Sequence, residues 1–117
     1  MRHRKAGRHF GRNSGQRKAL MRGLMNSLVL NERIITTEAK GKNVQPQVEK
    51  IITIAREDTE AHRRLVMAKL ANPLATLKLF EEIGPRFEGQ PGGYTQLFHL
   101  GQRQGDGASM VVLRLME

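Results

Sequence analysis

The apolar residues between positions 15 and 30 recur every three or four residues, which is the spacing of one face of a helix. This stripe consists of Leu20, Met21, Leu24, Met25 and Leu28. Asn13 and Ser14 precede it and belong to the residue types that cap the N-terminus of a helix. We therefore expect an amphipathic helix over residues 15–30, followed by a break at Asn31 and Glu32.

A second helical pattern follows a short run of β-branched residues. Residues 33–36 read Arg-Ile-Ile-Thr, which is typical of a strand, and Thr37 is suited to cap the helix that comes next. The stripe expected to face the core consists of Val44, Val48, Ile51, Ile52 and Ala55. Pro46 lies inside this pattern. We expect the helix to be kinked or divided there, because proline has no N–H and clashes with the preceding turn.

Two more helices are indicated by their capping residues. Asp58 and Thr59 are expected to start the first, and Asn72 with Pro73 supplies a cap and a first-position proline for the second. The residues expected to face inward are Ala61, Leu65 and Ala68 in the first helix and Leu74, Leu77, Phe80 and Ile83 in the second. Gly84 and Pro85 are expected to end the second helix.

The last third of the chain changes to the period of strands. Tyr94–Leu100 and Ser109–Met116 are separated by a glycine-rich link, which predicts an antiparallel hairpin with a long connection. The expected fold class is α+β, with about four helices packed on a small three-stranded mixed sheet and a flexible basic N-terminal arm. We expect residues 1–13 to be a separate arm and residues 14–117 to be a single globular domain.

The positive charge is concentrated at the N-terminal end. The chain carries 20 Lys+Arg against 11 Asp+Glu, a formal net charge of +9. Eight basic residues and no acid lie in the first 22 positions, so the other 95 residues hold 12 basic and 11 acidic side chains. The eight are Arg2, Arg4, Lys5, Arg8, Arg12, Arg17, Lys18 and Arg22. Charge concentrated in one segment suits an extended anionic partner, and nucleic acid is the leading candidate.

The composition of this segment favours nucleic-acid binding over the alternative, a solubilising tail. Arg outnumbers Lys six to two among the eight cations, and guanidinium groups make bidentate phosphate contacts where ammonium groups act as point charges. Gly7 and Gly11 permit close backbone approach, and Phe10 offers a ring that can stack on a base. We expect the arm to be disordered alone and to order on RNA.

Several other classes of function find no support. The chain has no cysteine, which removes thiolate chemistry and disulfides and leaves the cytoplasm as the expected location. No apolar run approaches the roughly 20 residues that span a bilayer, so no membrane partner is expected. An organelle transit peptide remains an alternative for the Arg-rich start.

The titratable residues do not form a recognisable reactive site. The histidines are His3, His9, His62 and His99, and none has a second ligand at a metal-binding helical spacing. Glu81 and Glu82 are adjacent on a predicted helix, so their carboxylates point apart. We expect no catalytic residue, no metal site, no cofactor and no small-molecule substrate.

Blocks of sequence along the whole chain carry a more specific signal. They are MRHRKAGRHFGRNSGQRKALMRGLMNSL, Ile35–Lys40, Val48–Ala55, Arg63-Arg64, Leu79-Phe80, Gly84–Phe87, Pro91–Thr95 and Arg103–Ala108. In this order and spacing the blocks resemble the bacterial L-seventeen family of large-subunit ribosomal proteins over essentially the full length. The resemblance implies an α+β body on 23S-type rRNA near the mouth of the polypeptide exit tunnel, beside neighbouring ribosomal proteins, without catalysis or an obligatory cofactor.

The expected RNA-binding residues come from the charge pattern and from this resemblance. The family's basic N-terminal motif falls on Arg2, His3, Arg4, Lys5, Gly7, Arg8, Arg12, Asn13, Ser14, Arg17 and Arg22. The charge pattern adds Lys18 and the pair Arg63 and Arg64, for which a solvated helix face is the alternative. The resemblance adds Lys40, Lys42 and Arg86, and it also matches loop positions Tyr94 and Arg103, although core packing is the simpler expectation for Tyr94.

The sequence departs from the family pattern at a few positions. These are Gly41, Asn43–Gln45, Gln96 and Arg114. RNA contact is therefore not transferred to Asn43, Gln45 or Gln96, whereas the arm is unaffected.

Two other functions stay open. The helices expected after Asp58 and after Asn72 could form a helix-turn-helix for DNA, but Lys78 is the one basic residue of the second and lies near Glu81 and Glu82, the reverse of what a major-groove reader needs. An RNA-processing enzyme is supported by charge alone. We therefore predict a structural rRNA-binding protein of the large ribosomal subunit, bound to ribosomes in the cytoplasm.

Overall fold

The first helix, α1 (Ser14–Asn31), begins where the capping residues predict. A computed structural model describes residues 13–117, so the arm predicted over residues 1–13 lies outside the described residues except for Asn13. The Asn13 carboxamide oxygen accepts a hydrogen bond from the Gln16 N–H (2.8 Å), and Gln16 Oε1 accepts one from the Asn13 N–H (3.3 Å). This reciprocal capping box satisfies two donors at the start of the helix. Glu32, at φ 64°, ends it in the left-handed conformation.

The buried side of α1 is rotated slightly from the predicted stripe. The buried residues are Met21, Met25, Leu28 and Val29, whereas Leu20 and Leu24 are partly buried against the core. The predicted amphipathic helix is confirmed, with its two methionines closer to the centre than the leucines that precede them.

The second helix, α2 (Glu38–Ala55), carries the predicted buried stripe. Thr37 caps it, its hydroxyl oxygen accepting from the Lys40 N–H at 3.4 Å. Val44, Val48, Ile51, Ile52 and Ala55 are all buried, and Gly41 joins them. The helix is not divided at Pro46, whose ring lies on the exposed side.

The third helix, α3 (Glu60–Leu70), presents a different face to the core from the predicted one. Thr59 caps it as expected, but Ala61, Leu65 and Ala68 are exposed and the buried residues are Val66 and Leu70. The prediction of the inward face was wrong because α3 packs against α1, α2 and α4, and this packing buries Val66 and Leu70, which are four positions apart. The carbonyls of its last turn accept hydrogen bonds from two side chains of α1.

The fourth helix is longer than predicted and is built from three segments. They are α4 (Pro73–Lys78), the wider π-helical turn η1 (Leu79–Ile83) and α5 (Gly84–Arg86). The prediction that Gly84 and Pro85 end the helix was wrong. The Gly84 N–H donates five residues back to the Leu79 carbonyl, and Pro85 occupies the first turn of α5, where its missing N–H is tolerated.

The inward face of this helix also differs from the prediction. Phe80 and Ile83 are buried as expected, but Leu74 and Leu77 are 70% and 43% exposed. Ala75 and Thr76 are buried in their place, and the Thr76 hydroxyl donates to the Asn72 carbonyl at 2.8 Å. Because that bond satisfies the hydroxyl, Thr76 can face the core together with Ala75. Two small residues at these positions let α4 lie close to the neighbouring helices.

The three strands form an antiparallel sheet, so the prediction of a mixed sheet was wrong. They are β1 (Arg33–Thr37), β2 (Thr95–Gln102) and β3 (Ser109–Leu115), in the order β1-β3-β2. The central strand β3 is antiparallel to both neighbours. The predicted hairpin of β2 and β3 is confirmed, with a bulge between His99 and Gly101.

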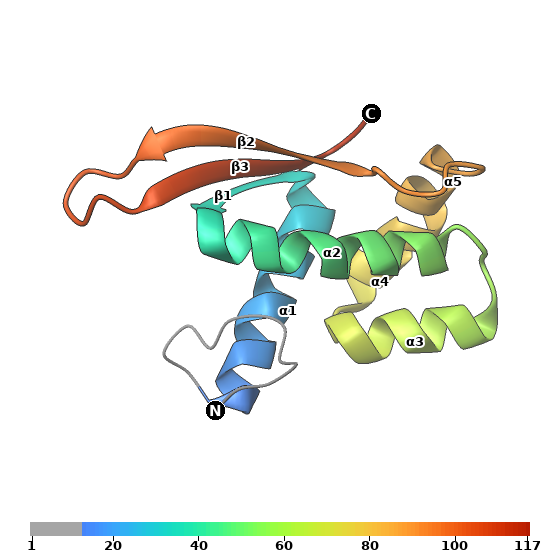
Figure 1. Cartoon of the computed structure of the whole chain (residues 1–117). Coiled ribbons are helices and arrows are strands. Elements are labelled where there is room, and N and C mark those ends of the chain that lie inside the picture. The colour runs from blue at the N-terminus through green and yellow to red at the C-terminus, as the bar shows by residue number, and fades with distance from the viewer. Residues whose placement is uncertain (1–12) are drawn as a thin grey trace, which may run out of the picture.

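The sheet and the helices lie in layers, with α2 between the sheet and α3 (Figure 1). One face of the sheet covers α2, and the hairpin tip extends past the helices. Tyr94 is fully buried just before β2, and its hydroxyl lies 3.0 Å from the Thr53 hydroxyl and donates to the Gln90 carbonyl at 3.0 Å. Core packing is therefore confirmed for Tyr94. The observed class is the predicted α+β.

Candidate nucleic-acid interface

A basic groove lies where the first half of α1 meets α2 and the end of α3. It has a volume of about 500 Å³. Its lining residues are Arg17, Lys18, Met21, Arg22, Met25, Gln47, Ala68 and Lys69. The groove brings together Arg17, Lys18 and Arg22, three of the residues predicted to bind RNA, and adds Lys69, which lies far away in the sequence.

Hydrogen bonds between α1 and α3 fix the shape of this groove. Arg22 Nε donates to the Lys69 carbonyl at 3.1 Å, and Asn26 Nδ2 donates to the Leu70 carbonyl at 3.0 Å. Both acceptors belong to the last turn of α3, where backbone carbonyls have no partner within the helix. Arg22 therefore binds the end of α3 through one nitrogen. Its guanidinium carries five N–H groups, so other donors remain near the groove.

The groove combines positive charge with an apolar floor. Four of its lining residues are cationic, none of the residues named above is acidic, and Met21 and Met25 are buried beneath the charges. Like charges gathered at one depression repel one another and attract an anion that can lie among them. Flexible basic side chains above a methionine floor suit a phosphate backbone whose sugars and bases lie over apolar surface.

Two other predicted contacts lie at the start of α2, away from the groove. Lys42 Nζ forms an ion pair with Glu38 Oε1 at 2.9 Å, with 59% of the lysine side chain exposed. It lines a separate depression of about 320 Å³ with residues of the hairpin, including Ser109. Lys40 is half-buried in the first turn of the helix. The exposure of Lys42 leaves it accessible to a further anion.

Arg63 and Arg64 on α3 differ in their availability. Arg63 donates to both carboxylate oxygens of Asp58 at 2.7 Å and lies over the Phe80 ring, with its Cζ 5.2 Å from the ring centroid. This hydrogen-bonded pair raises the pKa of Arg63 and lowers the pKa of Asp58. Arg64 pairs with Glu60 at 3.1 Å, with 71% of its side chain exposed. Arg64 is thus the more accessible of the two.

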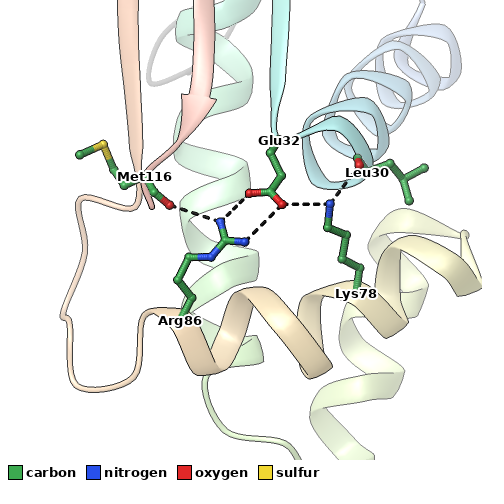
Figure 2. Close-up of polar contacts among 5 residues, drawn as sticks. All are labelled: Leu30, Glu32, Lys78, Arg86 and Met116. Carbon is green, nitrogen blue, oxygen red and sulfur yellow. Dashed lines mark hydrogen bonds and ion pairs between the residues drawn. The ribbon is translucent and has the colours of Figure 1, made fainter.

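Arg86 has an internal partner rather than an open position. Its guanidinium donates to both carboxylate oxygens of Glu32 (2.6 and 3.2 Å) and to the Met116 carbonyl (3.3 Å), as Figure 2 shows. These contacts join the end of α1, the end of α5 and the C-terminal segment. The Arg86 hydrogen bond lowers the pKa of Glu32, and the Glu32 hydrogen bond raises the pKa of Arg86.

The same cluster bears on the helix-turn-helix hypothesis. Lys78 Nζ lies 3.1 Å from Glu32 Oε2 and donates to the Leu30 carbonyl at 3.0 Å, with 20% of its side chain exposed (Figure 2). Both cations of the helix that would read DNA, Lys78 and Arg86, are therefore directed at Glu32. A recognition helix needs its basic side chains free to reach a groove.

The remaining sequence matches have local partners too. Arg103 donates from Nε and Nη2 to the Asp106 carboxylate within the hairpin turn, at 3.1 and 2.5 Å. Asn13 uses its side chain to cap α1. Arg2, His3, Arg4, Lys5, Arg8 and Arg12 lie outside the described residues.

Residues 13–117 contain neither a cluster of metal ligands nor a membrane-spanning helix. Within that range no three His, Asp or Glu side chains gather where a metal ion could be held. None of the helices in the described part of the chain is long and apolar enough to cross a membrane.

The sequence analysis missed the two other polar residues of the groove, Gln47 and Lys69. Lys69 is an isolated cation in the last turn of α3, and Gln47 is a polar residue inside an amphipathic helix. Neither carries a local pattern. The position of Lys69 follows from the contact between Arg22 and the end of α3. That contact joins residues 47 positions apart, so no local pattern predicts it.

The fold and the groove together define a small basic α+β protein with the electrostatic features of nucleic-acid binding. Residues 20–116 match the family model described as Ribosomal protein L17. A curated protein of Thermomicrobium roseum, described as large ribosomal subunit protein bL17, is 55% identical over 116 residues, which cover 99% of each chain. The chain belongs to the ribosomal protein L17 family. The resemblance seen in its sequence blocks is confirmed.

Proposed function

We propose that this chain is a structural protein of the large ribosomal subunit that binds 23S-type rRNA and helps to organise it near the polypeptide exit tunnel. Family membership supports the ribosomal assignment. The observation that carries the RNA-binding part is the groove in which Arg17, Lys18, Arg22 and Lys69 surround a methionine floor.

The groove and the arm form one continuous interface in this proposal. Arg17, Lys18 and Arg22 lie in the first half of α1, directly after the segment that holds Arg2, Arg4, Lys5, Arg8 and Arg12. His3 and Asn13 add polar donors in the same stretch. An RNA backbone that enters the groove can therefore be followed by the arm, with each bound phosphate releasing condensed counterions.

The other predicted contacts divide into two groups. Lys40, Lys42 and Arg64 remain proposed secondary contacts, because their elements present them at or near the surface. Arg63 can add positive charge but is already paired with Asp58. Arg86 is left out of the proposed interface, since its guanidinium is occupied by Glu32 and Met116.

The mechanism of this protein is scaffolding rather than catalysis. A folded body fixes the position of the groove, and cationic side chains lower the repulsion between phosphates of RNA segments that must lie close together. Such a role needs no cofactor and no small-molecule substrate. It places the protein on ribosomes in the cytoplasm, beside other large-subunit proteins.

Incorporation into large subunits tests the proposal. The chain is expressed in a bacterium from which that organism's own L17 protein has been removed. The fraction of purified large subunits that contain the chain, its occupancy, is measured at several salt concentrations. Lys18→Glu should lower the occupancy at high salt by roughly tenfold, because an attractive phosphate contact becomes repulsive. Glu near the start of a helix is compatible with the helix dipole, so the fold should be unaffected.

Lys50→Glu is the matched control. Lys50 is also an exposed lysine on a helix, α2, but it lies outside the groove. Occupancy close to that of the unchanged chain is expected for this variant. Equal losses in the two variants would mean that net charge, rather than the groove, governs binding, and failure of the unchanged chain to enter large subunits would refute the proposal.

A further inference from the structure

The outer face of the sheet, on the side away from α2, carries an apolar row that no described element covers (Figure 1). Ile35, Val112 and Phe98 are paired across the three strands. Ile35 is 58% exposed and Phe98 is 42% exposed. Side chains of this kind at adjacent positions form a continuous apolar strip, because paired residues on one face of a sheet lie next to each other.

In the middle of the sheet, the three strands carry apolar residues on both faces. The neighbouring row, Ile34, Leu113 and Leu97, is also paired across the sheet and packs against the core. Since successive residues of a strand point to opposite faces, each strand places one large apolar side chain inward and one outward. Apolar residues on both faces are typical of strands that are covered on both sides. The outer row is therefore expected to have a cover.

Arginines lie beside the apolar row. Arg33 and Arg114 are directly paired between β1 and β3, and Arg114 donates to Gln96 Oε1 at 3.1 Å. The Arg114 Cζ also lies 5.2 Å from the centroid of the Phe98 ring. Directly opposed like charges destabilise a sheet. A carboxylate placed between the two guanidinium groups would remove that repulsion.

The composition of the strands agrees with a protein partner. Strands β1, β2 and β3 contain no Lys, Asp or Glu among their described residues. Depletion of these types with retention of Arg and aromatic residues is the signature of the central part of a protein interface. Ile35 and Val112 have no π-face on which a base could stack, and one side of Phe98 already faces Arg114, so RNA fits this surface less well.

We infer that this face, defined by Ile35, Val112, Phe98, Arg33 and Arg114, is the docking surface for a second protein of the large subunit. The partner segment would place an apolar side chain on the row and a carboxylate between the arginines. Another copy of this chain does not fit, because the same strands of a second copy carry no carboxylate to place between the arginines. The inference rests on the proposed function and adds the chemistry of a neighbouring protein.

Photocrosslinking in assembled subunits tests this inference. Ile35 is replaced by a diazirine-bearing amino acid, which reacts with protein and RNA alike, and large subunits containing the full chain are irradiated and digested. The expected product is one peptide of another protein with an Asp or Glu close to an apolar residue. Arg33→Glu should lower the yield of that product by about tenfold, as an attractive contact becomes repulsive.

The control and the opposing outcomes separate this inference from the proposed function. Lys50→Glu, which changes the net charge equally, should leave the yield unchanged. A crosslink to rRNA, a crosslink to a second copy, a protein crosslink insensitive to Arg33→Glu, or no crosslink in subunits that contain the chain would each overturn the docking surface alone. A chain that fails to enter large subunits would refute the proposed function as well.

Discussion

At the scale of single residues, Glu32 connects more parts of the fold than any local pattern indicates. Its φ of 64° is unusual for a residue with a side chain, and glycine is the common residue at this position after a helix. Its carboxylate receives Arg86 and Lys78, and its backbone carbonyl accepts from the Leu115 N–H at 2.9 Å. These contacts help to stabilise a glutamate in the left-handed conformation.

Replacing Glu32 with Gln should lower the free energy of unfolding by about 1–2 kcal/mol, the range of a charged hydrogen bond that solvent partly screens. Gln keeps the size and backbone constraints of Glu, so the loss reports the charge. Urea denaturation at pH 7 measures it. Glu88→Gln, at an exposed glutamate, is the control and should change little. Equal stabilities of Glu32→Gln and the unchanged chain would contradict a stabilising role for the cluster.

The same pair gives a pH dependence with a definite sign. Arg86 lowers the pKa of Glu32 below 4.5 in the folded state, so the unfolded state takes up its proton first as the pH falls. The stabilisation from Glu32 is therefore complete above the ordinary pKa and is lost as pH falls through the lower folded value. The stability difference between the unchanged chain and Glu32→Gln should shrink in urea titrations below pH 4.5. A difference that grows under acid would contradict this assignment.

The hairpin turn offers a second titration. The Arg103 hydrogen bonds, followed by the Ala108 N–H bond, lower the pKa of Asp106 to about 2. Arg103→Gln should return this pKa most of the way to its ordinary value of 3.8, since the charged hydrogen bonds from Arg103 are removed. Carboxyl chemical shifts of Asp106 followed by NMR against pH measure the change. An Asp106 pKa near 3.8 in the unchanged chain would show that the pair does not form in solution.

At the scale of elements, local capping signals predicted where helices begin, but they did not predict which faces the helices bury. Asn13, Thr37, Thr59 and Asn72 all cap helices in the structure. In α3 and α4 the large leucines that were expected to face the core are exposed. Tertiary packing instead buries the side that contains Val66 in α3 and the side that contains Ala75 in α4.

The two errors in α3 and α4 have a common physical cause. A short helix with apolar residues on several sides has no strong preference for one orientation, so the neighbour that it packs against decides. The stripe of α2 was correct because its large aliphatic residues lie on one side. The groove could be predicted only in part. Its cations on α1 are close together in the sequence, whereas Lys69 joins them only because α3 packs on α1.

Close contact between elements predicts the effect of a glycine substitution. A Cβ added at Gly84 in α5 would overlap the Ala55 carbonyl at the end of α2, whose carbon would be only 2.9 Å away. Gly84→Ala should therefore lower the free energy of unfolding by about 1–3 kcal/mol. Thermal and urea denaturation measure this change.

Gly23→Ala is the matched control for this substitution. A Cβ at Gly23 in α1 would meet nothing within 4 Å, so alanine should stabilise the helix there by about 0.5–1 kcal/mol. Opposite signs for the two substitutions are expected. A destabilising Gly23→Ala together with a neutral Gly84→Ala would contradict the packing of α5 on α2.

At the scale of the whole molecule, the chain consists of a folded body and a cationic N-terminal segment. Residues 1–12 hold five of the 20 Lys and Arg residues and none of the 11 acids, so residues 13–117 carry 15 basic and 11 acidic side chains. The groove in α1 continues the charge of the arm onto the body, and the outer face of the sheet lies on another side of α2 (Figure 1). The proposed RNA interface and the proposed docking surface therefore do not overlap on the body.

Deletion of residues 1–12 tests this division. The deletion keeps Asn13 and with it the capping box of α1, so the free energy of unfolding should stay within about 0.5 kcal/mol of the full chain. Occupancy in large subunits should fall strongly, because five cations are lost. A truncated chain that is unfolded, or that enters subunits as well as the full chain, would contradict the proposed separation.

The most direct test of the central claim is the salt dependence of binding to isolated large-subunit rRNA. If the arm and groove neutralise about six to eight phosphates, the logarithm of the association constant should fall with the logarithm of salt concentration at a slope of roughly −4 to −7. A slope near zero would contradict an interface built on phosphate contacts.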